Sequence, residues 1–323
     1  MSQHIRELEI STRPLPGTAR YTTEYDNDEV LKLCLSDKTV HTLPKRVQLH
    51  YLTTVFIRGS YSIEKNILVS MSAFKYCSRL RILRLENTVV TDETVHFSPS
   101  IEKLIIRSTV LQICTTADII EALPIGTRSI GLEAVRTDET DGTSGVTDEV
   151  HDLTGIGRLH NLQYLSISNM SIRLPTDISR LTSLKQWVIS KCPDTPIPDD
   201  IAVLTSLLDL RMPGCNITEI PDSLYEMKQL KYINLSYNQI ADASVLERLC
   251  SISNLHYLWI EGNGMTGQLP PVSSLSKLTN LQHLCIANND LEGELTDEVV
   301  SSLPSLTMLS ANDNGRLTVS ISR

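Results

Sequence analysis

The 323-residue sequence has no excess of basic residues, few aromatics and no long apolar run. Lys and Arg number 29 against 38 Asp and Glu, and this net charge of −9 argues against bulk binding to nucleic acid or to an anionic membrane. No apolar stretch approaches the length of about 18 residues that a membrane-spanning helix needs, so no such helix is expected. The first thirty residues hold no apolar core of a secretory signal, which predicts a cytoplasmic protein.

The cysteines lack the pairing expected of an extracellular disulfide scaffold. There are seven, an odd number, and most stand within apolar patterns. We therefore expect buried, free thiols that act as small hydrophobic side chains. Three N-x-[ST] sequons begin at Asn169, Asn216 and Asn234, but about two would arise by chance and no export signal accompanies them.

One line of apolar residues recurs through the chain. In the stretch 207–221 it consists of Leu207, Leu210, Met212, Ile217 and Ile220. The same L-x-x-L-x-L-x-x-N/C form begins at 184, 207, 230, 255, 281 and 306, at intervals of 23, 23, 25, 26 and 25 residues. This form and this period are the signature of the leucine-rich repeat.

The spacing also predicts the shape of each repeat. Alternation over 210–212 indicates a short strand with one buried face, which becomes stable only when neighbouring repeats stack into a parallel sheet. An Asn at the ninth position can bond backbone that the following bend leaves unpaired. Segments 197–207 and 220–230 begin with Pro and Asp, which predicts short helical returns capped by Asp. The predicted fold is an α/β solenoid, a leucine-rich-repeat horseshoe with a parallel concave sheet and short helices or loops on the convex side.

The repeats do not run evenly through the whole chain. Residues 1–29 are polar and carry no repeat line, so we interpret them as an N-terminal tail or cap. Residues 30–323 are predicted to form one solenoid of about 11–12 repeats, the early ones weak. The segment 137–150 has five acidic residues and no basic one, which indicates a solvated loop inserted between repeats.

Several stretches carry a resemblance to a known family. The sequence IGRLHNLQYLSISN and its continuation (156–224), with HTLPKRVQLHYLTTVFIRGS (41–60) and FKYCSRLRILRLENT (74–88), resembles the repeat region of plant intracellular nucleotide-binding leucine-rich-repeat immune receptors. Those receptors carry a nucleotide-binding module before the repeats, whereas this chain has no G-x-x-x-x-G-K-[ST] loop. The resemblance therefore implies the sensing and autoinhibitory part, without nucleotide hydrolysis.

Two further resemblances concern the repeat type. The L-P-x-x-I-x-x-L returns look like those of plant Ras-group leucine-rich-repeat proteins, which are scaffolds. The runs GMTGQLP (264–270) and DLEGEL (290–295) look like the plant-specific repeat type.

Motifs that suggest other chemistry are better explained by the repeats. Residues 262–267 match G-x-G-x-x-G, but the following QLPPV opposes the helix that dinucleotide binding requires. The acids of 137–150 do not fit a calcium loop, and His256, His283 and Cys285 lack further converging ligands. No nucleophile–base motif is evident, so we expect no catalysis, no cofactor and no metal.

The residues between the apolar strand positions point away from the core. They are basic on the early rungs (Arg58 among them) and aromatic on the later ones, and exposed Arg, Tyr and Trp dominate binding hot spots. We predict that the concave face binds protein ligands through Arg84, Lys103, Arg107, Tyr164, Asp209, Arg211, Tyr232, Tyr237, Tyr257, Trp259, Glu261 and His283. The alternatives are that packing between rungs explains the aromatics, and that the basic rungs hold the acidic loop 137–150.

Three functions remain open on this evidence. The favoured one is a non-catalytic protein-recognition module that senses a ligand or effector in plant-type innate immune signalling. The second is a constitutive scaffold or regulator of the Ras-group type. The third is an enzyme or small-molecule receptor that uses the concave face. The sequence does not decide the oligomeric state.

Overall fold

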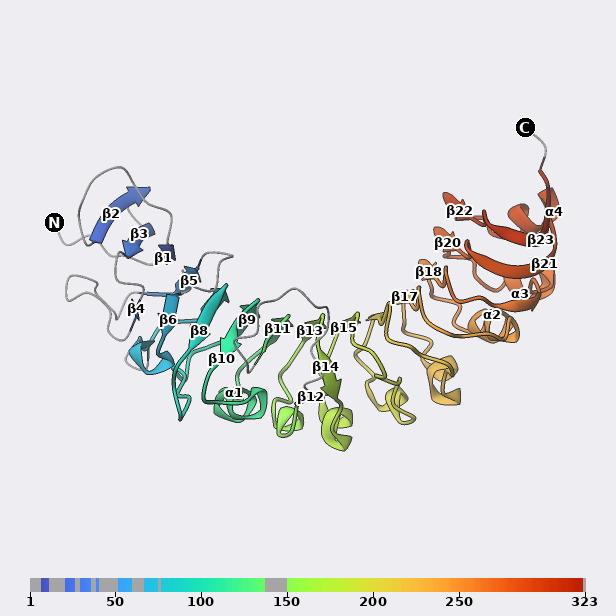
Figure 1. Cartoon of the computed structure of the whole chain (residues 1–323). Helices are drawn as coiled ribbons and strands as arrows, with labels where there is room; N and C mark the ends of the chain where they lie inside the picture. The colour runs from blue at the N-terminus through green and yellow to red at the C-terminus, as the bar shows by residue number, and fades with distance from the viewer. Residues whose placement is uncertain are drawn as a thin grey trace. The chain divides into compact units, whose positions relative to one another are not determined.

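The computed structural model describes residues 7–11, 21–26, 30–35, 39–40, 52–59, 67–74, 77–136 and 150–321 (Figure 1). The chain divides into two compact units, Met1–Leu181 (unit 1) and Thr182–Arg323 (unit 2). The predicted acidic loop lies outside the described residues apart from Val150, and so does most of the predicted N-terminal tail.

Unit 1 is built on a parallel sheet with one strand per repeat. In spatial order its strands are β2 (Tyr21–Asp26), β3 (Val30–Leu35), β1 (Glu7–Ser11), β5 (Thr54–Arg58), β7 (Ile82–Glu86), β9 (Lys103–Arg107), β11 (Ser129–Glu133) and β13 (Tyr164–Ser168). Only the β2–β3 pair is antiparallel among the pairs described here. Strands β1 and β2 fall within the predicted tail or cap, so parts of that segment join the sheet; its boundary at residue 29 stays a prediction.

Shorter elements complete the repeats of unit 1. A second sheet runs in the order β10 (Val110–Leu111), β8 (Thr88–Val90), β6 (Ile67–Val69) and β4 (Thr39–Val40), and β12 (Val150–Asp152) pairs with β14 (Ser171–Arg173). The helical elements are η3 (Met71–Phe74), α1 (Thr116–Ala122), η4 (Ile156–Arg158) and η5 (Thr176–Arg180).

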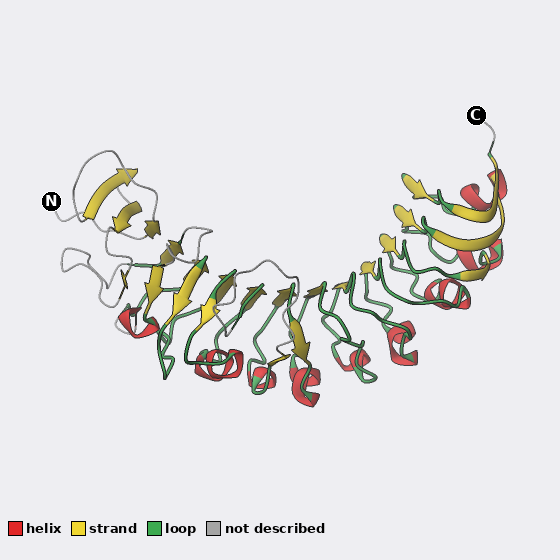
Figure 2. Ribbon diagram, in the orientation of Figure 1, coloured by secondary structure: helices red, strands yellow, loops and turns green. Residues whose placement is uncertain are grey.

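Unit 2 repeats the same plan with its strands in sequence order. They are β15 (Gln186–Ser190), β16 (Asp209–Arg211), β17 (Tyr232–Asn234), β18 (Tyr257–Trp259), β20 (His283–Cys285) and β22 (Met308–Ser310), all parallel. A side sheet holds β19 (Thr266–Gln268), β21 (Asn289–Thr296) and β23 (Asn314–Ser320), and the returns are η6 (Ile201–Val203), η7 (Asp222–Glu226), α2 (Ser244–Leu249), α3 (Val272–Leu275) and α4 (Asp297–Ser301). In Figure 2 these helices lie on the side of unit 2 opposite its main strands. The predicted repeat solenoid is confirmed.

The apolar repeat positions form the core. Leu207, Leu210 and Met212 are fully buried, and Trp187 fills the equivalent place in the repeat before them. Burial of one such side chain contributes about 1.5–3 kcal/mol, but only because the neighbouring rung covers it. Stability is therefore shared between adjacent repeats.

A left-handed residue follows each main strand from β7 to β22, directly or three residues after the strand ends. Its φ is positive in ten successive repeats, at Asn87, Ser108, Ala134, Asn169, Lys191, Gly214, Tyr237, Gly262, Asn288 and Asp313. This conformation costs a non-glycine residue about 1–2 kcal/mol, so the surrounding structure must hold it in place. In the last four of these repeats the next residue along the chain, the ninth of the repeat line, is an Asn that bonds the adjoining turns.

An asparagine at the ninth position forms hydrogen bonds to the turns of two neighbouring repeats. Asn238 Oδ1 accepts from the backbone N–H groups of Cys215 (2.9 Å) and Ile217 (3.1 Å), and its Nδ2 donates to the carbonyls of Met212 (2.8 Å) and Leu235 (2.9 Å). Asn263, Asn289 and Asn314 repeat this arrangement. We call these four residues the asparagine ladder. It satisfies buried backbone groups that would otherwise lack partners.

One detail of the predicted returns is wrong. The segments after Pro198 and Pro221 form 3-10 turns, and neither η6 nor η7 has a hydrogen bond from a capping side chain. The N-cap of η7 is Pro221 itself, which leaves Asp222 inside the first turn. At η6 the N-cap Asp200 has φ −98° and ψ 20° instead of the extended backbone typical of a capping residue, and the Pro221 side chain has no acceptor atom.

Candidate recognition surface on the parallel sheet

The strands of unit 2 place two rows of side chains on the face of the sheet opposite the core. In β17 and β18 the first and third residues are partly exposed and the middle one is buried. The strand register aligns Gln186, Asp209, Tyr232, Tyr257 and His283 in one row, and Val188, Arg211, Asn234, Trp259 and Cys285 in the other. We call this surface the unit 2 sheet face.

Aromatic rings stack along the first row. The centroids of Tyr232 and Tyr257 lie 4.6 Å apart with their planes inclined by 13°. Tyr257 continues to His283 at 4.5 Å and meets the edge of Trp259 at 6.2 Å, while His256 lies 6.4 Å from Tyr232. Such contacts contribute about 0.5–1.5 kcal/mol each and hold the rings in place before any partner arrives.

A polar group adjoins this stack. Asp209 accepts from Gln186 Nε2 at 2.7 Å and from Arg211 Nε and Nη2 at 2.8 Å each. The Arg211 guanidinium lies 5.9 Å from the centre of the Tyr232 ring. Asp209 is only 8% exposed, and its contact with a partner stays a prediction. The Asp209 carboxylate holds the Arg211 guanidinium beside the Tyr232 ring through two hydrogen bonds.

Two predicted residues lie at the edge of this face. Tyr237 is the left-handed residue after β17 and is 60% exposed, and its backbone N–H donates to the carbonyl of Glu261 at 2.8 Å. Its ring covers Gly262, where an added Cβ would lie 2.7 Å from the Tyr237 ring. Both predicted residues therefore belong to the turns that follow β17 and β18.

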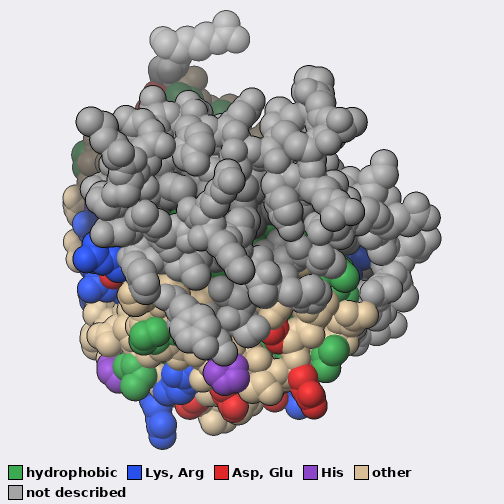
Figure 3. Space-filling view, turned by 90° about the vertical axis from the view of Figure 1, so that its left-hand side faces the viewer, with side chains coloured by type: hydrophobic (Ala, Val, Ile, Leu, Met, Phe, Trp, Pro, Cys, Tyr) green, Lys and Arg blue, Asp and Glu red, His purple; other side chains and the backbone are tan. Residues whose placement is uncertain are grey.

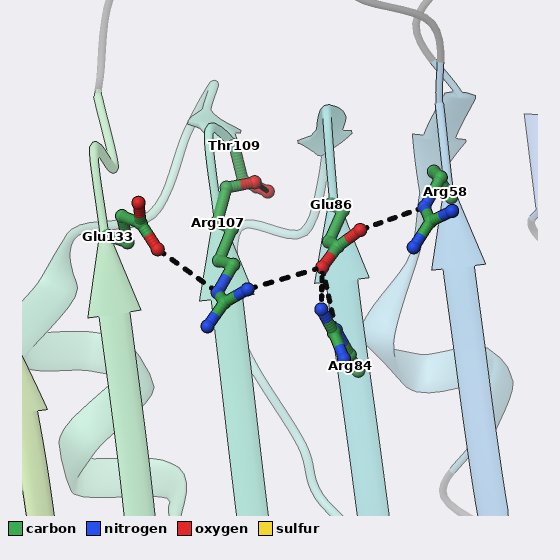
Figure 4. A network of polar contacts seen from close by, with 6 residues as sticks. All are labelled: Arg58, Arg84, Glu86, Arg107, Thr109 and Glu133. Carbon is green, nitrogen blue, oxygen red and sulfur yellow. Dashed lines mark hydrogen bonds and ion pairs between the residues drawn. The ribbon is translucent and has the colours of Figure 1, made fainter.

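The first group of predicted residues belongs to unit 1. The strand register aligns Arg58, Glu86, Arg107 and Glu133 across four neighbouring strands. Glu86 pairs with Arg58 Nε at 2.9 Å, with Arg84 Nε at 2.7 Å and with Arg107 Nη1 at 3.8 Å (Figure 4). Arg107 Nε also reaches Glu133 at 3.1 Å. Phe56 completes the cluster, with the Arg58 and Arg84 guanidinium groups 4.6 and 4.8 Å from its ring centre.

These contacts show that the predicted basic early rungs also carry acidic side chains, while their binding role stays a prediction. The three arginines share two carboxylates, and basic and acidic side chains also lie side by side on the described surface in Figure 3. Partial burial disfavours the charged form of Glu86, but hydrogen bonds and charges from Arg84 and Arg58 outweigh it and lower its pKa. Arg58, Arg84 and Arg107 are thus paired with carboxylates of the same sheet. Among the other predicted residues, Lys103 is half-buried on β9 and Tyr164 is 46% exposed on β13.

Sequence reasoning missed the partners that set this geometry. Gln186 and Gln282 were not predicted, although Gln282 accepts a 3.3 Å hydrogen bond from the Tyr257 hydroxyl. Glu86 and Glu133 were missed as well. All but Gln282 occupy outward strand positions, so aligning those positions between repeats would have identified them.

The structure also bears on the alternative chemistries. The glycine run 262–267 leads into strand β19, so no helix N-terminus follows it as a dinucleotide site requires. Among the described residues, no three His, Cys, Asp or Glu side chains are grouped as metal ligands. The part of the chain that the structure describes contains no helix long and apolar enough to cross a lipid bilayer.

The repeats match a known protein family. The leucine-rich repeat region family matches residues 141–320, more than half of the chain. The chain belongs to this leucine-rich-repeat family. Receptor-like protein 39 of Arabidopsis thaliana is 33% identical over 91 residues, which cover 28% of this chain and 10% of that relative. The leucine-rich-repeat chain therefore matches only a small part of the length of its curated relative.

Solved structures similar to this chain include a plant receptor and a bacterial internalin, of which the receptor, with a TM-score above 0.5, shares the fold. The crystal structure of a TDR receptor has a TM-score of 0.52 at 19% identity and covers 81% of this chain and 42% of that one. Internalin InlF of Listeria monocytogenes has a TM-score of 0.47 at 19% identity, covering 80% of this chain and 82% of that one. By its family match and its relative in Arabidopsis thaliana, the chain is a leucine-rich-repeat protein-interaction module with a plant receptor-like relative. The nucleotide-binding receptor subclass stays a prediction.

Proposed function

We propose that the unit 2 sheet face binds a protein ligand, with the stacked row Tyr232–Tyr257–His283 at its centre. The observation that carries this proposal is that aromatic rings, partly exposed and held by one another, are aligned on successive strands. Aromatic side chains with little freedom to lose on binding are favoured at hot spots. The pair Asp209–Arg211 supplies a polar, directional contact beside them.

The biological setting that we propose is ligand or effector sensing in plant-type innate immunity, by a non-catalytic module in the cytoplasm. The matched plant receptor-like relative and the resemblance of residues 156–224 to plant immune receptors support the recognition role. The cytoplasmic placement rests on the sequence alone. A constitutive Ras-group scaffold is the alternative, favoured by the short 3-10 returns η5, η6 and η7. The sequence leading into η5 is L-P-x-x-I, and those leading into η6 and η7 are the variants I-P-x-x-I and I-P-x-x-L.

A displayed random peptide library tests the recognition surface. The library is selected in parallel on the wild-type chain, on Tyr257→Ala and on Val203→Ala, a control on η6 whose side chain is 44% exposed. We expect a peptide family that is enriched on wild type and Val203→Ala and is lost on Tyr257→Ala, because removal of a hot-spot ring costs about 2 kcal/mol, roughly thirtyfold in affinity. Equal enrichment on all three proteins would place recognition elsewhere. Thermal melts of all three proteins verify that they remain folded.

A second experiment separates the two biological settings. The chain is used to capture partners from plant tissue with and without an elicitor of immune responses. Partners that bind only after treatment support sensing, whereas the same signalling enzymes under both conditions support the scaffold.

A further inference from the structure

Unit 2 also contains a pocket that the sheet face does not use. It lies between the turns that follow β15 and β16 and has a volume of about 360 Å³. The lining comes from Asp194–Ile197 and Asp199 in one repeat and from Asn216–Pro221 in the next. Both turns precede the helical returns, so the pocket lies outside the two rows of the sheet face.

The backbone explains why a hollow forms here. Later repeats of unit 2 place β19, β21 and β23 between the main strand and the return, and these strands pair with one another. In the fully described stretch from β15 to η7 no such side strand is present. Instead the chain turns through left-handed residues at Asp194 and Asn216, each with a φ of 57°. Prolines at 196 and 221 line the pocket and donate no backbone hydrogen bond.

The floor of the pocket is apolar. Ile197, Ile217 and Ile220 line it and are 4%, 3% and 8% exposed. These side chains belong to the core of their repeats, so the floor is rigid and present without a ligand. A bound aliphatic chain would gain favourable contact by covering the remaining apolar surface.

The rim of the pocket is acidic. Asp194, Asp199 and Glu219 are exposed lining residues, and no Lys, Arg or His is among the described lining. Asn216 Nδ2 donates to Asp194 Oδ1 at 3.2 Å, which orients one carboxylate and leaves its second oxygen available to a ligand. The three carboxylates do not qualify as a metal site, since the described residues contain no group of three metal-binding side chains.

An apolar floor beneath a carboxylate rim fits one kind of side chain well. Lysine and arginine lay their methylene stems along apolar surface while the charged head reaches polar groups at the edge. We propose that this pocket is a second protein-binding site, which takes a Lys or Arg side chain with an adjacent apolar residue from a partner segment. The site is independent of the proposed role of the sheet face.

The test uses a chain whose sheet face is disabled. A displayed random peptide library is selected on the Tyr232→Ala/Tyr257→Ala double variant, produced in the bacterial cytosol so that the Asn216 sequon stays unmodified. Recovered peptides should carry Lys or Arg next to an aliphatic residue. Their affinity, measured by fluorescence anisotropy, should fall at least tenfold when Asp199→Asn and Glu219→Gln are added.

A control removes one acidic charge outside the pocket, and it is compared with Asp199→Asn and Glu219→Gln made singly. Glu298→Gln, an exposed acid in α4 outside the pocket lining, should leave the affinity unchanged within twofold. Absence of any enriched peptide, enrichment without basic residues, or equal loss with Glu298→Gln would overturn the proposal. Circular dichroism melts establish that each variant is folded. Failure here leaves the sheet-face proposal untouched, because that proposal is tested on the wild-type rings.

Discussion

Removal of one asparagine of the ladder should destabilise unit 2 locally. Asn289 Oδ1 accepts from the backbone N–H groups of Asn263 and Met265, both at 3.0 Å. Its Nδ2 donates to three carbonyls, those of Ile260 (3.2 Å), Ile286 (3.0 Å) and Ala287 (3.1 Å). Asn289→Ala deletes all five hydrogen bonds, and Ala offers the two buried N–H groups no replacement acceptor.

The magnitude follows from those two donors. A buried N–H left without a partner costs about 1–3 kcal/mol, so the substitution should cost about 2–6 kcal/mol. This is a large part of the about 5–15 kcal/mol that stabilises an ordinary domain. Because repeats are stabilised by their neighbours, unit 2 should unfold in a separate transition at lower urea concentration than unit 1.

Urea denaturation followed by circular dichroism measures the loss, and hydrogen exchange locates it. The amides of Asn263 and Met265 should exchange much faster in Asn289→Ala, while unit 1 amides such as that of Leu104 should be unchanged. Asn280→Ala is the matched control, since its exposed side chain makes one 3.4 Å hydrogen bond, and it should cost less than about 0.5 kcal/mol. A variant at position 289 as stable as the control would refute the role of the ladder.

Three further predictions concern other parts of the chain. Glu86→Gln should lower the free energy of unfolding of unit 1 by about 1 kcal/mol at pH 7. Because folding lowers the pKa of Glu86, the stability of the wild-type chain should fall as the pH drops from about 4.3 through the folded pKa. Below that pKa the two proteins should be equally stable. Urea midpoints against pH measure this, and a constant difference down to pH 2 would contradict it. Burial raises the pKa of Cys77, Cys114 and Cys215 to about 11 and that of Cys250 to about 12. Iodoacetamide at pH 8 should therefore label these thiols only after denaturation. Rapid labelling of any of them in the native chain would contradict this prediction. Trp259→Phe should change the free energy of unfolding by less than about 1 kcal/mol, because the buried indole Nε1 has no hydrogen-bond partner among the described residues. Trp259→Ala should cost about 2 kcal/mol, because it removes the whole ring. Similar losses in both variants would mean that the indole N–H is hydrogen-bonded.

The sequence predicted the fold because a repeat has few alternatives. Apolar residues spaced as Leu207, Leu210 and Met212 bury their side chains only if neighbouring rungs stack, so period and fold follow together. The alternation of strand residues likewise placed Tyr232 and Tyr257 on successive strands.

Contacts between repeats were harder to predict. Glu86 neutralises arginines that lie near it only in the folded chain, so counting Arg58, Arg84 and Arg107 alone overstated the charge of that surface. The ring stacking depends on rotamers, which the strand pattern does not specify. The pocket arises where a side strand is missing, and this depends on the backbone at Asp194 and Asn216.

The most direct measurement compares the affinity of one selected peptide for the wild-type chain, Tyr257→Phe and Tyr257→Ala by titration calorimetry. If the stacked ring is the centre of recognition, Tyr257→Phe should bind within about threefold of wild type, because it loses only the 3.3 Å hydrogen bond to Gln282. Tyr257→Ala should bind about thirtyfold more weakly. Equal affinities for all three proteins would contradict the assignment of the unit 2 sheet face as the recognition surface.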